Sequence, residues 1–200
     1  MTTLALGLFL IYLLVAFLGR ALLLKRATGT AGWRGISGRP GSAAWFGGVL
    51  FAVALALGVA APVADLLGAS VVFESDVLRG VGLAVFLAGA SGSLAVQQAM
   101  GATWRVGVDA TEQTDLVRAG PFSHVRNPFF TALVVAALGL TLMVPGVLAF
   151  LGLGLLVLAI QLQVRAVEEP YLLAAHGDGY RAYAESTGRF VPGVGTLGRR

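Results

Sequence analysis

The sequence predicts an all-α, polytopic transmembrane bundle of about five spans, followed by an amphipathic C-terminal segment on the cytoplasmic side. Hydrophobic residues make up 57% of the chain and charged residues 12%, and the mean hydropathy is +0.84. A soluble domain of 200 residues does not need so much apolar surface. The apolar residues also gather into five stretches, each near the roughly 20 residues that a helix needs to cross a bilayer. We therefore expect one integral membrane domain over residues 1–200.

The predicted spans cover residues 4–24, 44–67, 77–100, 128–144 and 146–164. The first is expected to be a retained span, because its positive charges follow the apolar run, whereas those of a secretory signal precede it. Val144-Pro145-Gly146 predicts a tight turn, so the last two spans should form a hairpin. Small residues in the third span, including Gly82, Gly89 and Ser93, predict close helix packing in lipid.

The basic residues predict the orientation. Lys and Arg total 14, and with the N-terminus outside only Arg79 falls near an outer connection. Cytoplasmic loops of membrane proteins carry an excess of Lys and Arg. We therefore expect an inner or plasma membrane protein with its N-terminus outside and its C-terminus in the cytoplasm. The net charge of +4 then reflects topology and contact with membrane lipids, not a nucleic-acid partner.

Metal chemistry is not expected from this composition. The chain has no cysteine, which excludes disulfides and a Cys-bearing metal site. It has two histidines, which argues against a centre with several His ligands.

Charged and aromatic residues gather at both cytoplasmic ends of the predicted hairpin, where ionisable groups are costly to hold and mark a functional site by default. At the first end, Asn127 suits a helix N-cap, and Pro128 fits the first turn. The positive end of the helix dipole and the charge of Arg126 would favour an anionic ligand group.

At the second end, the spacing of Arg165, Glu168 and Glu169 places all three on one face of an α-helix. Arginine suits a carboxylate, and glutamates accept hydrogen bonds from hydroxyl or ammonium groups. A short amphipathic helix is expected after Pro170, ending at Gly177.

A structural explanation stays open for each of these residues. The arginines would then be topological anchors that bind lipid phosphate, and the two glutamates would pair with Arg165 or with solvent. Phe129, Phe130, Trp104, Tyr180 and Tyr183 would form an interfacial aromatic belt.

Over residues 95–192 the chain resembles the isoprenylcysteine carboxyl methyltransferase family, within a group of membrane methyltransferases that also includes phospholipid N-methyltransferases. The matching segments are Gly120 and Phe122, Arg126-Asn127-Pro128-Phe129-Phe130, Arg165-Ala166-Val167-Glu168-Glu169-Pro170-Tyr171-Leu172, Gly177-Asp178-Gly179-Tyr180-Arg181-Ala182-Tyr183 and Arg189-Phe190-Val191-Pro192. The first three spans match only as generic membrane helices. Two residues depart from the family pattern: Asn127 stands in place of His, and Phe130 in place of a frequent Tyr.

The resemblance implies an S-adenosylmethionine-dependent methyltransferase that acts on a lipid-like or apolar acceptor, with the cofactor site at the cytoplasmic end of the hairpin and the C-terminal segment closing over it. It implies catalytic roles for Arg165 and Glu168. It also implies a cofactor-binding set formed by Gly120, Phe122, Arg126, Asn127, Pro128, Glu168, Glu169, Tyr180 and Tyr183. The segment 100–109, with Trp104 and Arg105, is expected to line the mouth of the site.

Two other functions remain open on the sequence. The first is an NADPH-dependent membrane enzyme like the sterol reductases, which have a related bundle. The second is a non-catalytic membrane scaffold whose ligand site has decayed, an alternative motivated by Asn127.

Overall fold

The computed structural model describes residues 1–29, 36, 38–100 and 116–198, and within these residues every regular element is helical. The elements are α1 (Thr2–Leu13), the π-helix η1 (Leu14–Gly19), α2 (Arg20–Thr28), α3 (Ala43–Leu66), α4 (Asp76–Met100), the 3-10 helix η3 (Gly120–Ser123), α5 (Pro128–Met143), α6 (Val147–Gln163), the π-helix η4 (Val164–Glu168) and α7 (Glu169–Ser186). This confirms the predicted all-α fold class.

Within the described residues, four helices are long and apolar enough to cross a membrane: Thr2–Arg26, Ala43–Leu66, Asp76–Met100 and Val147–Ser186. The apolar helix Pro128–Met143 is shorter. The helix that begins with α6 runs for 40 residues through η4 into α7. A kink at Gly177 interrupts this helix, so its straight part covers residues 147–176. At 1.5 Å per residue this part is about 45 Å long, which exceeds the hydrocarbon thickness of about 30 Å, so α6 spans the membrane and η4 and α7 extend beyond it.

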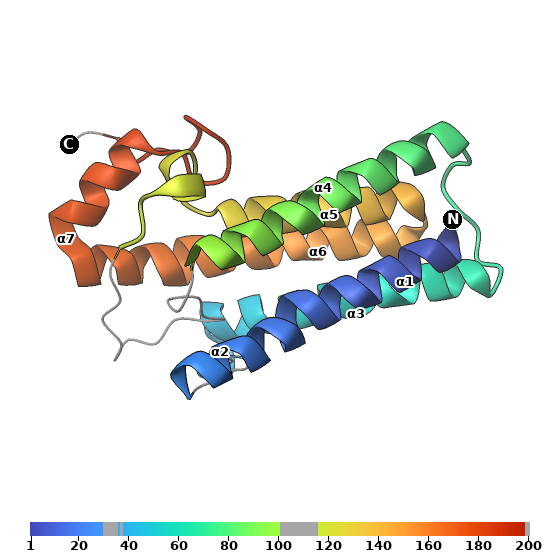
Figure 1. Ribbon diagram of the computed structural model, residues 1–200, viewed down its shortest axis with the longest axis horizontal. Helices are drawn as coiled ribbons and strands as arrows, with labels where there is room; N and C mark the ends of the chain where they lie inside the picture. Colours follow the sequence, from blue (N-terminus) through green and yellow to red (C-terminus); the bar gives the residue numbers. More distant parts are fainter. Residues whose placement is uncertain (30–35, 37, 101–115, 199–200) are drawn as a thin grey trace.

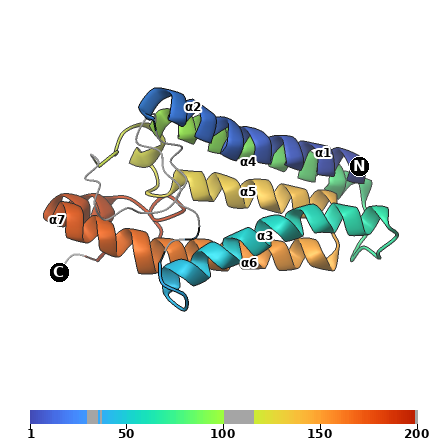
Figure 2. The same cartoon turned by 90° about the horizontal axis from the view of Figure 1, so that it is seen from below.

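The helices pack as two principal pairs, α4 with α5 and α3 with α6. Figure 1 shows α4, α5 and α6 along one side of the molecule and α1, α2 and α3 along the other, and Figure 2 gives the view at right angles. The predicted turn at Val144-Pro145-Gly146 joins α5 to α6, with the Gly146 N–H donating to the Val144 carbonyl at 2.8 Å. However, α5 packs more extensively on α4 than on α6, and α6 packs more extensively on α3 than on α5.

Glycines allow α4 and α5 to approach closely. A Cβ added at Gly82 would lie 2.8 Å from the Gly139 carbonyl oxygen, and one added at Gly89 would overlap the backbone of Ala136. In the opposite direction, a Cβ at Gly139 would overlap the backbone of Phe86. The close packing predicted for Gly82 and Gly89 is therefore confirmed. Van der Waals contact between backbones stabilises helix pairs in lipid, where the hydrophobic effect does not drive helices together.

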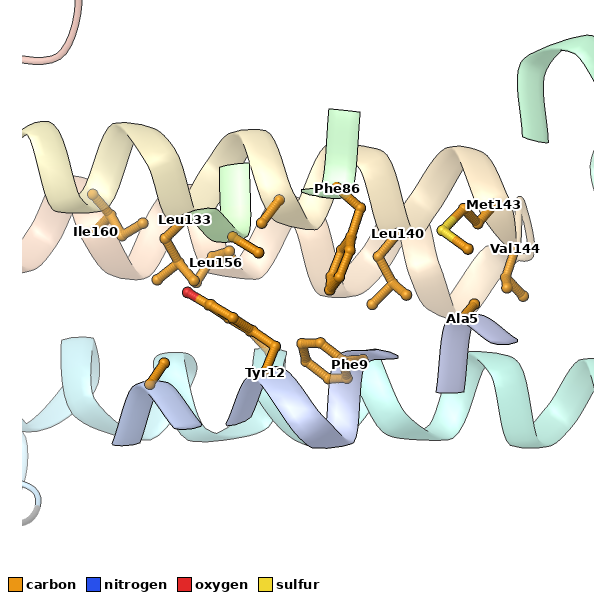
Figure 3. Packing of buried hydrophobic residues seen from close by; sticks show 14 of the residues in the cluster. Ala5, Phe9, Tyr12, Phe86, Leu133, Leu140, Met143, Val144, Leu156 and Ile160 are labelled. Atoms are coloured by element: carbon orange, nitrogen blue, oxygen red, sulfur yellow. The ribbon is translucent and has the colours of Figure 1, made fainter. Parts of the chain in front are cut away.

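Buried polar side chains connect α1 and η1 to α4 within the apolar core. The Tyr12 hydroxyl lies 2.9 Å from the Ser93 hydroxyl, and the Gln97 amide donates to the Ala16 carbonyl at 2.9 Å. Figure 3 shows Tyr12 and Phe9 pointing from α1 into the cluster formed with Phe86 and its neighbours. These hydrogen bonds fix the register of the first span against the third, because an unpaired polar group would be costly at this depth.

A methyl group at Gly89 is expected to separate α4 from α5. Gly89→Ala places its Cβ against the Ala136 backbone, which cannot rotate away, so overpacking should cost about 1–3 kcal/mol. Thermal unfolding in detergent, followed by circular dichroism, measures the effect. Gly80→Ala is the matched control on the same helix, since a Cβ there has no neighbour within 4 Å. An equal melting temperature for both variants would contradict the close-packing argument.

Candidate functional site

Most of the predicted site residues gather at one end of the bundle, where α5 begins and α6 ends; we call this the polar end. Figure 1 shows η3, α7 and the chain that follows α7 together at this end. The residues after α7, 187–197, form an irregular C-terminal segment that turns on itself between Val191 and Val194. The polar end is therefore built from segments that are far apart in the sequence.

Arg126 is buried at the centre of the polar end, and its guanidinium group connects three segments. Its Nη1 atom donates to the carbonyl of Ala184 at 2.9 Å and to that of Thr187. Its Nη2 atom donates to the Glu169 carboxylate at 2.7 Å and to the Gly195 carbonyl at 3.0 Å. Both terminal nitrogens are therefore bound within the protein, so Arg126 is already engaged without a ligand.

Glu169 is bound by two arginines. Besides Arg126, the Arg189 guanidinium donates from Nε to Oε1 at 2.7 Å and from Nη2 to Oε2 at 2.9 Å. This two-bond arrangement matches the planar shapes of the two groups. Burial opposes ionisation, but the hydrogen bonds from Arg189 and Arg126, together with their charges, outweigh it and hold the pKa of the Glu169 carboxyl below its usual range. We call Arg126, Glu169 and Arg189 the ion cluster.

The backbone before α5 pairs with the C-terminal segment. The Arg126 N–H donates to the Gly188 carbonyl at 2.8 Å, and the Asn127 N–H donates to the Arg189 carbonyl at 3.1 Å. Asn127 occupies the N-cap position of α5, but its side chain makes no capping bond and instead donates from Nδ2 to the Arg189 carbonyl at 3.1 Å. The expected side-chain cap is therefore wrong, and Gly188–Phe190 lies along the chain that enters α5.

The two tyrosines of α7 belong to a second packed cluster. Tyr180 and Tyr183 are buried and meet edge to face, with ring centroids 6.2 Å apart. The Tyr183 hydroxyl donates to the carbonyl of Phe122, which is itself buried in η3, at 2.6 Å. Burial, together with the Glu169 charge, raises the pKa of Tyr180 to about 12. Burial also raises the pKa of Tyr183, so both phenols are neutral, and the Tyr183 hydroxyl holds α7 against η3. The exposed Gly120, at φ 62°, makes the turn that starts η3.

The expectation that Arg165, Glu168 and Glu169 share one face is wrong. They lie in and beside the π-helix η4, where hydrogen bonds run from residue i to i+5 and the helix winds differently from the α-helix that the prediction assumed. Arg165 is exposed and donates to Gln161 at 2.6 Å, whereas Glu169 turns into the ion cluster. Neither described glutamate pairs with Arg165.

Glu168 differs from its neighbour in having no cationic partner among the described residues. It is partly buried and forms a hydrogen bond with Gln163, the last residue of α6. Burial raises the pKa of Glu168 to about 7, the Gln163 bond opposes this rise, and the charge of Glu169 adds to it. The two adjacent glutamates thus differ: Glu169 is ion-paired with two arginines, whereas the pKa of Glu168 is raised to about 7.

Pro170 and Gly177 shape α7 as expected. Pro170 lies in the first turn, and Gly177 adopts φ 52° and ψ −124°, which breaks the helix into residues 169–176 and 178–186. Only glycine adopts such backbone angles readily. The change of direction after Gly177, visible in Figure 1, brings Tyr180 and Tyr183 back over η3.

The sequence-based site list omitted Arg189, Thr187 and Gly195, which bind the predicted residues directly. Arg189 had a signal, because it begins the Arg189-Phe190-Val191-Pro192 motif; the other two contribute only carbonyl oxygens, which leave no trace in side-chain patterns. The expected contributions of Trp104 and Arg105 lie outside the described residues.

Removing the charge of Glu169 is expected to destabilise the protein. Glu169→Gln leaves the buried Arg126 and the partly buried Arg189 without a carboxylate, which should cost about 3 kcal/mol. Thermal unfolding in detergent measures the loss. Asp178→Asn is the control, because the Asp178–Arg181 pair on the same helix is solvent-exposed and should contribute little. Similar melting temperatures for the two variants would contradict a stabilising ion cluster.

The ion cluster also predicts how stability depends on pH. Because the pKa of Glu169 is lower in the folded state than its usual value of 4.5, its contribution is fully present above about pH 5. The contribution disappears as the pH falls through the lowered folded-state pKa. The difference in unfolding free energy between the native protein and Glu169→Gln should therefore be constant near neutrality and shrink in acid; a constant difference throughout would refute the assignment.

Comparison with known proteins identifies the family. The family model described as phospholipid methyltransferase matches residues 77–179, just over half of the chain. The match includes nearly all of α4, which the sequence analysis treated as a generic membrane helix, and it ends before Tyr180 and the C-terminal segment. No curated protein matches the sequence. The chain belongs to the phospholipid methyltransferase family, within the membrane methyltransferase group that the isoprenylcysteine carboxyl methyltransferases typify.

Proposed function

We propose that this protein is an S-adenosylmethionine-dependent methyltransferase that acts on a lipid-like or apolar acceptor, with its site at the polar end. The observation that carries the proposal is that motif residues from η3, the start of α5, α7 and the C-terminal segment meet there in one hydrogen-bonded assembly. This assembly sits directly at the end of an apolar bundle, and family membership supplies the reaction class.

The available hydrogen-bonding groups fit the cationic part of the cofactor. Glu168 lacks a cationic partner among the described residues, and its carboxylate would accept from an ammonium or from ribose hydroxyls. The Asn127 amide oxygen would be a second acceptor. Arg126 and Glu169 fit a supporting role better than a direct one, because they already bind each other and the C-terminal segment. Tyr180 and Tyr183 likewise support the fold of the site.

When bound, S-adenosylmethionine supplies a methyl group on a sulfonium. Glu168 and Asn127 would hold this group, and the chemistry that it would supply is displacement of the methyl group by a nucleophile of the acceptor, with the sulfur as the leaving group. Such a displacement depends on alignment of the two reactants more than on proton transfer. The task of this chain is therefore to bind, orient and exclude water, and a site held by ion pairs and main-chain hydrogen bonds suits that task.

The position of the proposed site supports an apolar acceptor. Exposed Leu, Ile, Val and Phe side chains cover the outer faces of the spans, so the bundle is surrounded by lipid. A lipid-like acceptor would reach the polar end sideways from the bilayer, with its reactive group at the interface. With the orientation expected from the basic residues, this reaction would take place on the cytoplasmic side. An enzyme equally active on acceptors with no apolar tail would contradict this part of the proposal.

Cofactor binding is expected to weaken as Glu168 is protonated. Because its pKa is raised to about 7, the carboxylate that attracts the cationic cofactor is lost as the pH falls below that value. Calorimetry with the detergent-purified protein should give a dissociation constant for S-adenosylmethionine that rises at acid pH. Glu168→Gln should bind about tenfold more weakly near pH 8, which corresponds to one charge-assisted hydrogen bond, and with a smaller pH dependence.

Glu185→Gln is the control for this experiment, because Glu185 lies on α7 outside the set proposed to hold the cofactor. Absence of S-adenosylmethionine binding in folded native protein would overturn the proposed function. Thermal stabilisation by NADPH in its place would favour the reductase, and stabilisation by neither ligand would favour the scaffold.

A further inference from the structure

Arg189 makes two kinds of contact with the polar end. Its guanidinium is bound to both carboxylate oxygens of Glu169, at 2.7 and 2.9 Å. Its carbonyl oxygen accepts from both the main-chain N–H and the side-chain amide of Asn127, each at 3.1 Å. Its own N–H donates to the Val194 carbonyl at 2.8 Å, which closes the turn of the C-terminal segment. Arg189 therefore ties the orientation of Asn127 to the ion cluster.

These contacts determine how the Asn127 amide is oriented. A carbonyl oxygen only accepts hydrogen bonds, so the amide must present its NH2 group to Arg189 and its Oδ1 atom elsewhere. Oδ1 accepts no hydrogen bond from any residue in the described part of the chain. Asn127 is also only partly buried, unlike the adjacent Arg126. The side chain thus has an NH2 group bound to Arg189 and an acceptor, Oδ1, to which no described residue donates.

We propose that Arg189 is a positioning residue for the cofactor site: anchored on Glu169, it holds the Asn127 amide so that Oδ1 accepts a hydrogen bond from an ammonium or hydroxyl group of the bound cofactor. This inference rests on the proposed function. It also gives a reason why asparagine can stand where the family pattern has histidine. A neutral imidazole offers one donor and one acceptor, and the amide of asparagine offers the same two groups. Asparagine keeps that pattern at every pH.

The side-chain anchor is tested by Arg189→Gln, which removes the bonds to Glu169 and leaves the main-chain carbonyl. The dissociation constant for S-adenosylmethionine should rise about tenfold, the loss expected for one misplaced charge-assisted hydrogen bond. Arg181→Gln is the matched control, since Arg181 is an exposed arginine that pairs only with the exposed Asp178 among the described residues. Unchanged binding by folded Arg189→Gln would overturn the positioning role.

The acceptor is tested by Asn127→His, which separates the two hydrogen bonds. At about pH 8 a neutral imidazole donates to the Arg189 carbonyl and still accepts, so the variant should bind S-adenosylmethionine within about threefold of the native protein. At about pH 5, below the usual imidazole pKa of about 6.5, both nitrogens are donors and the acceptor is lost. The ratio of the variant's dissociation constant to that of the native protein should then rise about tenfold.

Measurement of the native protein at both pH values is the reference that removes the contributions of the other charged and titratable groups at the polar end. These are Arg126 and His124 before α5, Glu168 in η4, Glu169 and Tyr180 on α7, and Arg189 in the C-terminal segment. Asn127→Ala, which has neither hydrogen bond, should bind weakly at both values.

The outcomes distinguish this inference from the proposed function. Native protein that binds S-adenosylmethionine, together with an Asn127→His variant whose relative affinity does not change with pH, would overturn the role of Oδ1 alone. Native protein that does not bind the cofactor would overturn both.

Discussion

The carboxylate of Glu169, bound by Arg126 and Arg189, is the interaction on which the polar end depends. It joins the loop before α5, the start of α7 and the C-terminal segment, which have no apolar core of their own large enough to hold them. Burial of charges is costly unless each one is paired and hydrogen-bonded. Here the second arginine and the carbonyls of Ala184, Thr187 and Gly195 supply those partners. The cluster therefore stabilises one arrangement of the segments and disfavours others.

The membrane part of the molecule follows a different physical rule. Lipid does not drive apolar helices together, so association depends on close backbone contact and on buried hydrogen bonds. Glycines at the α4–α5 contact provide the first, and the Tyr12–Ser93 and Gln97–Ala16 bonds provide the second. The bundle thus forms a rigid base, and α5 and α6 carry the two halves of the polar end at fixed positions on it.

The π-helix η4 gives neighbouring residues separate tasks. By shifting the helical phase where α6 becomes α7, it directs Glu169 into the ion cluster and leaves Arg165 exposed beside Gln161. Glu168 stays between them with only an amide partner and a raised pKa. The irregular turn therefore keeps one carboxylate for structure and another for the proposed binding of a cationic cofactor.

The sequence by itself determined the fold class and most of the span ends, and it indicated the motif residues that gather at the polar end. The predicted ends of the second, third and fourth spans agree with α3, α4 and α5 to within one residue, because hydrophobic length is a local property that the bilayer thickness sets. The first helix continues to Thr28, four residues past the predicted end, and the last continues through η4 into α7. The effects of Pro170 and Gly177 were also predictable from the sequence, since their backbone preferences are intrinsic.

Tertiary structure alone decided which charges meet. The pairing of Glu169 with Arg126 and Arg189, and not with Arg165, depends on a π-helical phase shift and on a chain reversal after α7. Neither leaves a periodic signal, because both arise from contacts between residues distant in the sequence.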